Sequence, residues 1–167
     1  MSTSDQEYLL TSQYKDSSNL NARIQIHKLF STNRTAFHRW VFDHFHVPHP
    51  ARLLEAGCGP GYLWAQNRDR IPEDWEITLS DFSAGMLQEA QSRLSGGSGH
   101  FSFQLFDIQS IPFENEHFDT VIANHMLYHV PDRAKALSEI RRVLKPGGVF
   151  MPSPTVQNTC KNYTGCS

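Results

Sequence analysis

The stretch "LLEAGCGPGYLW", residues 53–64, decides the fold class of this chain. It reads as an apolar strand that ends in Glu55, followed by a turn with glycine at positions 57, 59 and 61. A buried strand does not need glycine, but a turn that adopts positive φ or lies close to a ligand does. The turn runs into a helix predicted from about Tyr62 to Arg70, so backbone N–H groups at the helix N-terminus face a potential ligand.

Strands and helices alternate on the C-terminal side of this stretch. The predicted strands are "ARLLEA" (51–56), "EITLSD" (76–81), "FSFQLFD" (101–107), "FDTVIAN" (118–124) and "VFMP" (149–152). One helix starts at Ser83 and places Leu87, Ala90 and Leu94 on one face. Another covers "PDRAKALSEIRRVL" (131–144) and ends at "KPGG". This alternation favours a parallel sheet with crossover helices, so we predict an α/β, Rossmann-like, doubly wound fold.

The N-terminal part has a different pattern. Apolar residues between Leu20 and Phe45 suggest two helices, and Ser31, Thr32 and Asn33 between them have good N-cap chemistry for the second. The segment "HVPHP" then stops the helix, because two prolines forbid its continuation.

Composition excludes several classes of protein. The 167 residues include 39% hydrophobic residues, and 15 basic against 17 acidic residues give a net charge of −2. This balance gives no electrostatic footprint for nucleic acid or an anionic membrane. Three cysteines are too few for a disulfide framework. The polar segment "MSTSDQEYLL" (1–10) and the lack of an apolar stretch of about 20 residues lead us to expect neither a signal peptide nor a membrane span. No HExxH spacing occurs, and no histidines surround Cys160 and Cys166 near the end of the chain, so we predict no metal site. The few cysteines and the expected lack of signal and membrane segments predict a cytoplasmic protein.

Acidic or amide side chains close four successive predicted strands. They are Glu55, Asp81, Asp107 and Asn124. In an open α/β sheet, ligands bind beyond the carboxyl ends of the strands, where the strand order reverses. The glycine spacing differs from the dinucleotide fingerprint, because Tyr62 stands where the third glycine belongs, and no Gly-Lys-Ser/Thr follows. Glu55 would repel a pyrophosphate, so we predict a ligand with positive charge near Glu55 and a ribose near Asp81.

At this point the chain resembles the class I S-adenosylmethionine-dependent methyltransferases, in particular the small-molecule methyltransferases. The resemblance runs through "LLEAGCGPGYLW", "ITLSDFSAGMLQEA", "FQLFDIQSIPFENEHFDTVIANHMLYHV" and "EIRRVLKPGGVF". These segments cover roughly residues 50 to 150 in the right order and spacing. The implied domain is residues 18–152 with a helical lid at 18–46, between a flexible N-terminus (1–17) and an irregular tail (153–167).

The resemblance implies a role for each matching position toward S-adenosylmethionine. Glu55 and the backbone of Gly57, Cys58, Gly59 and Gly61 would hold the methionine part. Asp81 would accept from the ribose hydroxyls. The remaining implied contacts are Phe82 and Met86 on the adenine, Asp107 on its amine, Ile108 N–H on a ring nitrogen, Asn124 beneath the sulfonium, and Tyr14 closing over the cofactor.

Several of these side chains also have a structural alternative. Glu55 could be a surface strand end. Asp81 could cap the helix that follows it, although Ser83 can do so as well. Phe82 and Met86 could pack in the core. His125 and His129 are more often packing or surface residues than catalysts. His129 is the catalytic candidate, as the base for an oxygen or nitrogen acceptor that must lose a proton.

The family sheet has seven strands, and this chain ends soon after the fifth. The resemblance therefore implies a C-terminally truncated sheet with strand order 3-2-1-4-5, in which strands six and seven are missing. The fifth strand would be an exposed edge that invites a dimer or another partner. Two functions stay open: methyl transfer to a small-molecule acceptor, and a cofactor-binding module that is catalytically incomplete without a partner. A nicotinamide-dependent oxidoreductase is disfavoured by Tyr62 and Glu55.

Overall fold

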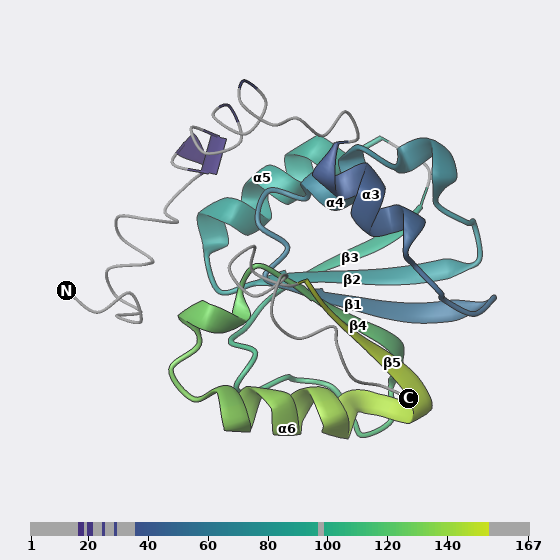
Figure 1. Ribbon diagram of the computed structural model, residues 1–167, viewed down its shortest axis with the longest axis vertical. Helices are drawn as coiled ribbons and strands as arrows, with labels where there is room; N and C mark the ends of the chain where they lie inside the picture. The colour runs from purple at the N-terminus through teal and green to yellow at the C-terminus, as the bar shows by residue number, and fades with distance from the viewer. Residues whose placement is uncertain are drawn as a thin grey trace, which may run out of the picture.

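The computed structural model describes Ser17, Ser18, Leu20, Asn21, Gln25 and Leu29, and then residues 36–96 and 99–153. Within these residues, five parallel strands form one sheet in the order β3-β2-β1-β4-β5 (Figure 1). The strands are β1 (Ala51–Ala56), β2 (Trp75–Asp81), β3 (His100–Leu105), β4 (Phe118–Asn124) and β5 (Leu144–Ser153). The predicted α/β class, doubly wound sheet and strand order are confirmed.

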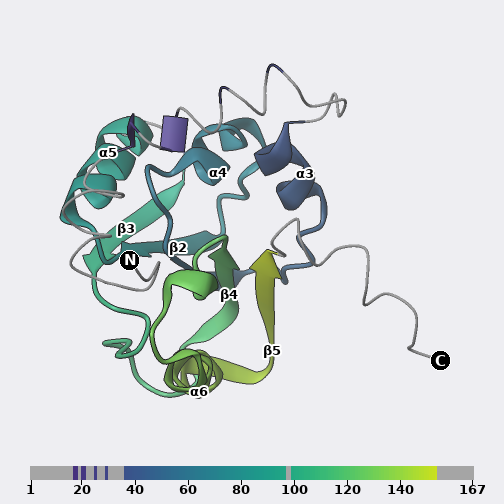
Figure 2. The ribbon, with the colours of Figure 1, turned by 60° about the vertical axis from the view of Figure 1, so that its left-hand side comes forward.

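Helices cover both faces of the sheet. The helices α3 (Phe37–Asp43), α4 (Tyr62–Ala65) and α5 (Ala84–Leu94) lie over one face, and α6 (Arg133–Val143) lies over the other (Figure 1 and Figure 2). Successive strand residues point to opposite faces. Leu53 therefore packs in the cluster that includes α4 and α5, Leu54 packs in the cluster that includes α6, and both are fully buried. Burial on both faces explains why successive residues of β1 and β4, such as Leu53 with Leu54 and Val121 with Ile122, are apolar.

Two strand boundaries differ from the prediction. The strand β3 ends at Leu105, so the prediction that Asp107 closes it is wrong. The strand β5 begins at Leu144, earlier than the predicted Val149. A register shift separates the pair Phe118–Leu144 from the pair Thr120–Val149, so the residues between Leu144 and Val149 form a bulge before regular pairing begins.

The start of α5 follows the sequence prediction, whereas the end of α4 does not. The prediction for α5 is confirmed, since the Ser83 hydroxyl accepts from the Met86 N–H at 3.3 Å as its N-cap. The predicted helix from Tyr62 to Arg70 is wrong, because α4 ends at Ala65 and a separate 3-10 helix, η2 (Arg68–Arg70), follows. The buried Asn67 explains the break: its amide donates to the carbonyl of Leu63 at 2.7 Å.

The N-terminal helices are described only in part. The helix α3 corresponds to the second predicted helix and ends before Pro48 and Pro50, where the imidazole Nδ1 of His44 bonds the Trp40 carbonyl at 2.7 Å. The predicted N-cap residues at 31–33 lie outside the described residues, as do most of the first predicted helix and the tail after Ser153. Across the described residues, we find no helix with the length and apolar character that crossing a bilayer requires.

Candidate functional site

The glycine turn between β1 and α4 has the predicted backbone. Gly57, Gly59 and Gly61 have φ values of +69°, +53° and +74°, which disfavour any residue with a Cβ. A Cβ at Gly57 would lie 2.8 Å from Met126, and one at Gly61 would lie 3.3 Å from the Ala90 side chain. A Cβ at Gly59 would meet only Leu20 among the described residues, at 3.9 Å. Gly57 and Gly61 are therefore required by packing, and Gly59 is where the backbone is open to a ligand.

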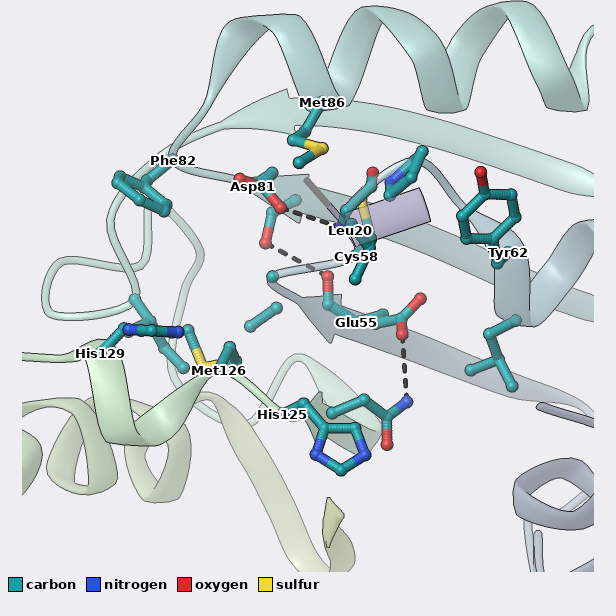
Figure 3. Close-up of a pocket in the computed structure, with 18 of the residues that line it drawn as sticks. Leu20, Glu55, Cys58, Tyr62, Asp81, Phe82, Met86, His125, Met126 and His129 are labelled. Carbon is teal, nitrogen blue, oxygen red and sulfur yellow. Dashed lines mark hydrogen bonds between the residues drawn. The ribbon is translucent and has the colours of Figure 1, made fainter. Parts of the chain in front are cut away.

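A pocket lies at the carboxyl ends of the strands, beside this turn (Figure 3). Eleven of the predicted site residues line it: Glu55, Gly57, Cys58, Gly59, Asp81, Phe82, Met86, Asp107, Ile108, Asn124 and His129. Gly61 does not line it and instead forms the N-cap position of α4. Tyr14 lies outside the described residues.

Glu55 is the most deeply buried acid of the pocket, with 2% of its surface exposed. Its Oε2 accepts from the Trp64 indole N–H at 2.7 Å, and its Oε1 accepts from the Asn124 amide at 3.1 Å (Figure 3). Burial raises the pKa of Glu55 from 4.5 to about 7, against these two hydrogen bonds, and the nearby Asp81 raises it further. A positive charge beside Glu55 would favour its ionised form.

Asp81 holds the turn and the start of the next helix together. Its Oδ2 accepts from the Gly59 N–H at 2.9 Å, and its Oδ1 accepts from the Ser83 N–H at 2.8 Å. Burial raises the pKa of Asp81, and hydrogen bonds from the backbone of Ser83, Gly59 and Phe82 oppose that shift. Asp81 therefore organises the backbone of the turn and also lines the pocket, while Ser83 caps α5.

Cys58 interacts electrostatically with both of these carboxyl groups. Its side chain is buried, and its Sγ donates to the Gly59 carbonyl at 3.4 Å. Burial, followed by the charges of Glu55 and Asp81, raises the pKa of the Cys58 thiol well above its usual range. The thiol therefore stays protonated, which makes it a poor nucleophile.

The far end of the pocket contains the predicted adenine contacts. Met86 and Ile108 are buried, and Phe82 lies across the pocket from Tyr62 (Figure 3). Asp107 follows β3 in a tight turn, where its carboxylate accepts from the backbone N–H of Gln109 at 2.9 Å and from the Gln109 amide at 2.8 Å. Its position is thus set by this turn and not by a strand end.

The segment after β4 brings two histidines to the pocket. His125 follows Asn124 directly and has φ +51°, a conformation that is costly for a residue with a side chain. His129 lies in the 3-10 helix η3 (Leu127–His129), with its ring 4.1 Å from that of Tyr128. Both line the pocket (Figure 3).

The predicted lid at residues 18–46 includes α3, but its individual pocket residues were not predicted. Phe37 and His38 line the same pocket. Burial lowers the pKa of His38 to about 4, assisted by His125 and opposed by a hydrogen bond with Gln66. Trp64 was missed as well, although it bonds Glu55 directly. His38 belongs to no motif, and Trp64 ends the quoted stretch 53–64 without a spacing that marks it as a partner of Glu55.

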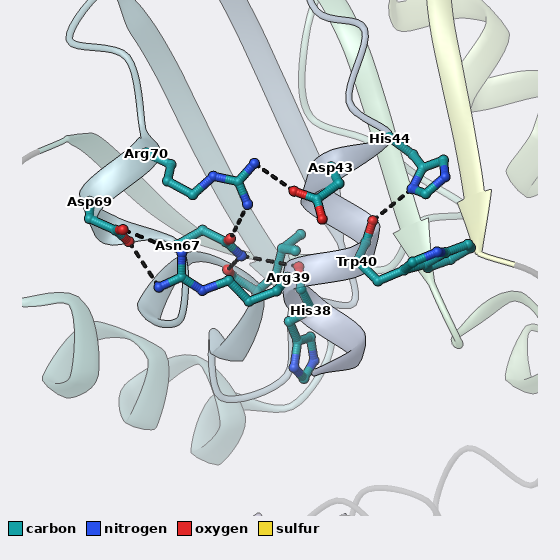
Figure 4. A network of polar contacts seen from close by, with 9 residues as sticks. His38, Arg39, Trp40, Asp43, His44, Asn67, Asp69 and Arg70 are labelled. Atoms are coloured by element: carbon teal, nitrogen blue, oxygen red, sulfur yellow. Dashed lines mark hydrogen bonds and ion pairs between the residues drawn. The ribbon is translucent and has the colours of Figure 1, made fainter. Parts of the chain in front are cut away.

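Polar contacts fix α3 against the segment after α4 (Figure 4). The Asn67 amide donates to the His38 carbonyl at 3.1 Å, and the Arg70 guanidinium pairs with Asp43 at 2.6 Å. A more exposed pair joins Arg39 to Asp69 at 3.2 Å. These contacts place Phe37 and His38 at the pocket. No three metal-ligating side chains gather within the described part of the chain.

The fold and the pocket together define a class of protein. A Rossmann-like sheet whose pocket lies at the switch between β1 and β4, with a glycine turn and buried acids, is typical of nucleoside-cofactor sites. The family model described as "Methyltransferase domain" matches residues 54–151. The chain belongs to this family, with the class I methyltransferase fold that the sequence predicted.

Curated relatives and solved structures that are named as methyltransferases are similar to this chain. The chain is 39% identical over 99 residues to a malonyl-[acyl-carrier protein] O-methyltransferase of Salmonella typhimurium, covering 59% of this chain and 37% of that protein. It is 32% identical over 112 residues to the ubiquinone/menaquinone biosynthesis C-methyltransferase UbiE of Proteus mirabilis, covering 66% and 45%. The chain thus spans less than half the length of these two relatives.

A solved complex is also similar. It holds the Haloferax volcanii Trm112 methyltransferase activator and a protein named as a methyltransferase. The match has a TM-score of 0.62 at 25% identity and covers 78% of this chain and 55% of the matched one.

Proposed function

We propose that this chain binds S-adenosylmethionine in the pocket and that the protein transfers its methyl group to a small molecule. The observation that supports this most is the convergence of Glu55, Asp81 and Asp107 on one pocket beside the glycine turn. When bound, the cofactor supplies a methyl group activated by a positively charged sulfonium. The pocket residues fit such a ligand, because buried carboxyl groups favour a cation and accept hydrogen bonds from hydroxyls.

The proposed roles follow the position of each residue. Glu55 and the turn of Gly57, Cys58, Gly59 and Gly61 bind the methionine part, with Gly59 as the point of closest approach. Asp81 binds the ribose, and its carboxylate oxygens keep lone pairs beyond those given to Gly59 and Ser83. The remaining proposed contacts are Phe82, Met86, Asp107 and Ile108 for the adenine, Asn124 beneath the sulfonium, and Tyr14 over the cofactor.

Alignment is the main task of the residues around the reacting atoms. Orientation of an activated donor and its acceptor can supply about 7–11 kcal/mol of rate acceleration. A base is needed only where the acceptor must lose a proton, and we propose His129 for that step. An H129A variant should lower the turnover number by at least about 100-fold if His129 is the base. A turnover number within a few-fold of wild type would remove this role.

The acceptor in this proposal is a small molecule. The names of two relatives support this choice: one is named for a malonyl group on a carrier protein and the other for ubiquinone and menaquinone biosynthesis. A benzoquinol and a malonyl thioester are therefore the first probes for radiolabelled methyl transfer. The lid at 18–46 and the cytoplasmic location belong to the same proposal, and Leu20, Phe37 and His38 of that lid line the pocket.

Calorimetric titration with S-adenosylmethionine and with NADH tests the cofactor proposal. We expect binding of the first and not of the second. A D81A variant should weaken cofactor binding by about 1.5–3 kcal/mol, the scale of a hydrogen bond to a charged group. The control is D74A, because Asp74 pairs with His49 on the surface and neither residue lines the pocket. Undiminished affinity of D81A would overturn the ribose assignment.

A second candidate is a cofactor-binding module that turns over only with a partner. The edge of β5 supports it, because β5 pairs only with β4 within residues 99–153 and Val149 is 40% exposed. The similar solved complex contains a methyltransferase activator. Light scattering should then show a dimer or a bound partner, and radiolabelled transfer into a metabolite extract should occur only in its presence. Transfer by the isolated monomer would reject this candidate.

A further inference from the structure

Four side-chain rings form a continuous row along one wall of the pocket. The ring centroids of Tyr62 and His38 are 6.0 Å apart, those of His38 and Phe37 are 5.4 Å apart, and those of Phe37 and His125 are 4.9 Å apart. All four residues line the pocket. They come from α4, from α3 and from the residue after β4, so only the fold brings them together.

The row lies at the Glu55 end of the pocket. Asn124, which donates to Glu55, is the residue directly before His125. Figure 3 draws Tyr62 and His125 near Glu55 and Phe82 at the opposite side. In the proposed binding mode, the methionine part lies at Glu55 and the adenine at Phe82. The row therefore borders the reactive methyl group, where an acceptor must approach.

The row is held in place, and the His38 imidazole in it is uncharged at pH 7. The Tyr62 hydroxyl donates to Asn21, and the Arg93 guanidinium covers the Tyr62 ring at 4.3 Å from its centroid. The pKa of His38, lowered by burial to about 4, keeps this imidazole neutral at pH 7. A neutral imidazole offers one donor and one acceptor for hydrogen bonds.

The row is not part of the buried core, although core packing is the simplest alternative. Phe37 is 40% exposed, and His125 keeps a costly positive φ at the pocket wall. Aromatic rings that remain accessible in a pocket favour ligands with a ring of their own, because paired rings add stabilisation beyond the area that they bury.

We propose that Tyr62, His38, Phe37 and His125 form the acceptor site and that they bind a planar, uncharged aromatic acceptor with a hydroxyl group. The ring of the acceptor packs along the row, and its hydroxyl bonds an imidazole nitrogen. This inference rests on the proposed function, since it takes the methyl end of the pocket from the proposed cofactor position.

Two matched probes test this inference without an activity assay. The protein is first saturated with S-adenosylhomocysteine, and then titrated with 2-naphthol or with its saturated analogue decahydro-2-naphthol. Both probes carry one hydroxyl on the same carbon skeleton, and only 2-naphthol is aromatic. We expect 2-naphthol to bind about three- to tenfold more tightly, the range that aromatic pairing adds to area burial. Imidazole signals of His38 and His125 should shift in NMR spectra, while those of His100, at the start of β3, should not.

A pair of variants on α3 gives the second measurement. F37L keeps an apolar side chain but removes the ring, and should lower 2-naphthol affinity about threefold without changing S-adenosylhomocysteine affinity. W40L is the control: Trp40 is an exposed ring of the same helix outside the pocket, 6.5 Å from the Phe37 ring, so this variant removes a neighbouring ring and keeps the row itself. Equal affinity for the two probes, or unmoved His38 and His125 signals, would overturn the aromatic acceptor site alone. Failure of S-adenosylhomocysteine to bind would overturn the proposed function and this inference with it.

Discussion

The two hydrogen-bond partners of Glu55 lie nine and 69 residues away along the chain. The indole of Trp64 contacts one carboxylate oxygen at 2.7 Å and the amide of Asn124 contacts the other at 3.1 Å. Both donors favour the ionised carboxylate, yet burial keeps the pKa of Glu55 at about 7. Asp81 and the protonated Cys58 thiol are the other titratable groups coupled to it. The charge of Glu55 at neutral pH therefore depends on small changes in its surroundings.

At this scale we predict that W64F weakens S-adenosylmethionine binding about tenfold at pH 7, the lower end for loss of a hydrogen bond to a charged group. Without the indole N–H the pKa of Glu55 rises, so a higher pH is needed to ionise it for a cationic ligand. Calorimetry between pH 6 and 9 should show the affinity of wild type rising through about pH 7, and that of W64F rising at higher pH.

The control for this prediction is W75F. Trp75 is also buried, but its indole donates to the Pro48 carbonyl at 3.2 Å and it does not line the pocket. W75F should keep the pH profile of wild type even if it lowers stability. Coincident pH profiles for W64F and wild type would show that Trp64 acts only in packing.

At the scale of elements, the contact between α3 and α4 decides the shape of the pocket wall. Asn67 joins them, because its buried amide donates to the carbonyls of both Leu63 and His38. The residue was part of a predicted continuous helix, since an Asn in a short amphipathic segment carries no signal of its tertiary partners. In contrast, a local turn, and not a strand end, sets the position of Asp107 through Gln109.

We predict that N67A lowers the free energy of unfolding by about 1–3 kcal/mol, because it leaves two carbonyls without their donor in a buried site. Denaturant unfolding of N67A and R39A measures this difference. The matched change R39A removes the exposed ion pair between α3 and η2 and should cost less than about 1 kcal/mol. Equal losses in the two variants would mean that Asn67 does not fix α3 against α4.

At the scale of the whole molecule, Glu55 makes stability depend on pH. Its pKa is raised from 4.5 to about 7 on folding, so the folded state binds a proton more tightly than the unfolded state. The resulting stabilisation is fully present below pH 4.5 and is lost as the pH rises to about 7. The lowered pKa of His38 acts in the opposite direction, with stability lost as the pH falls from 6.5 toward about 4.

An E55Q variant isolates the Glu55 contribution, because His38 is common to both proteins. The stability of E55Q relative to wild type should increase by about 3 kcal/mol between pH 4.5 and pH 8, from a shift of this size at about 1.4 kcal/mol per pKa unit. Urea unfolding at several pH values measures the difference. A constant difference across this range would contradict the raised pKa.

The sequence by itself determined the strands β1, β2 and β4, the helix α5 with its Ser83 cap, and the acidic residues that face the pocket. These depend on periodicity and capping, which are properties of neighbouring residues. Only the tertiary structure decided the protonation of Glu55 and His38, the partner of Trp64 and the row of rings from Tyr62 to His125. The reason is physical: burial and contacts between distant segments exist only once the sheet and its helices have packed.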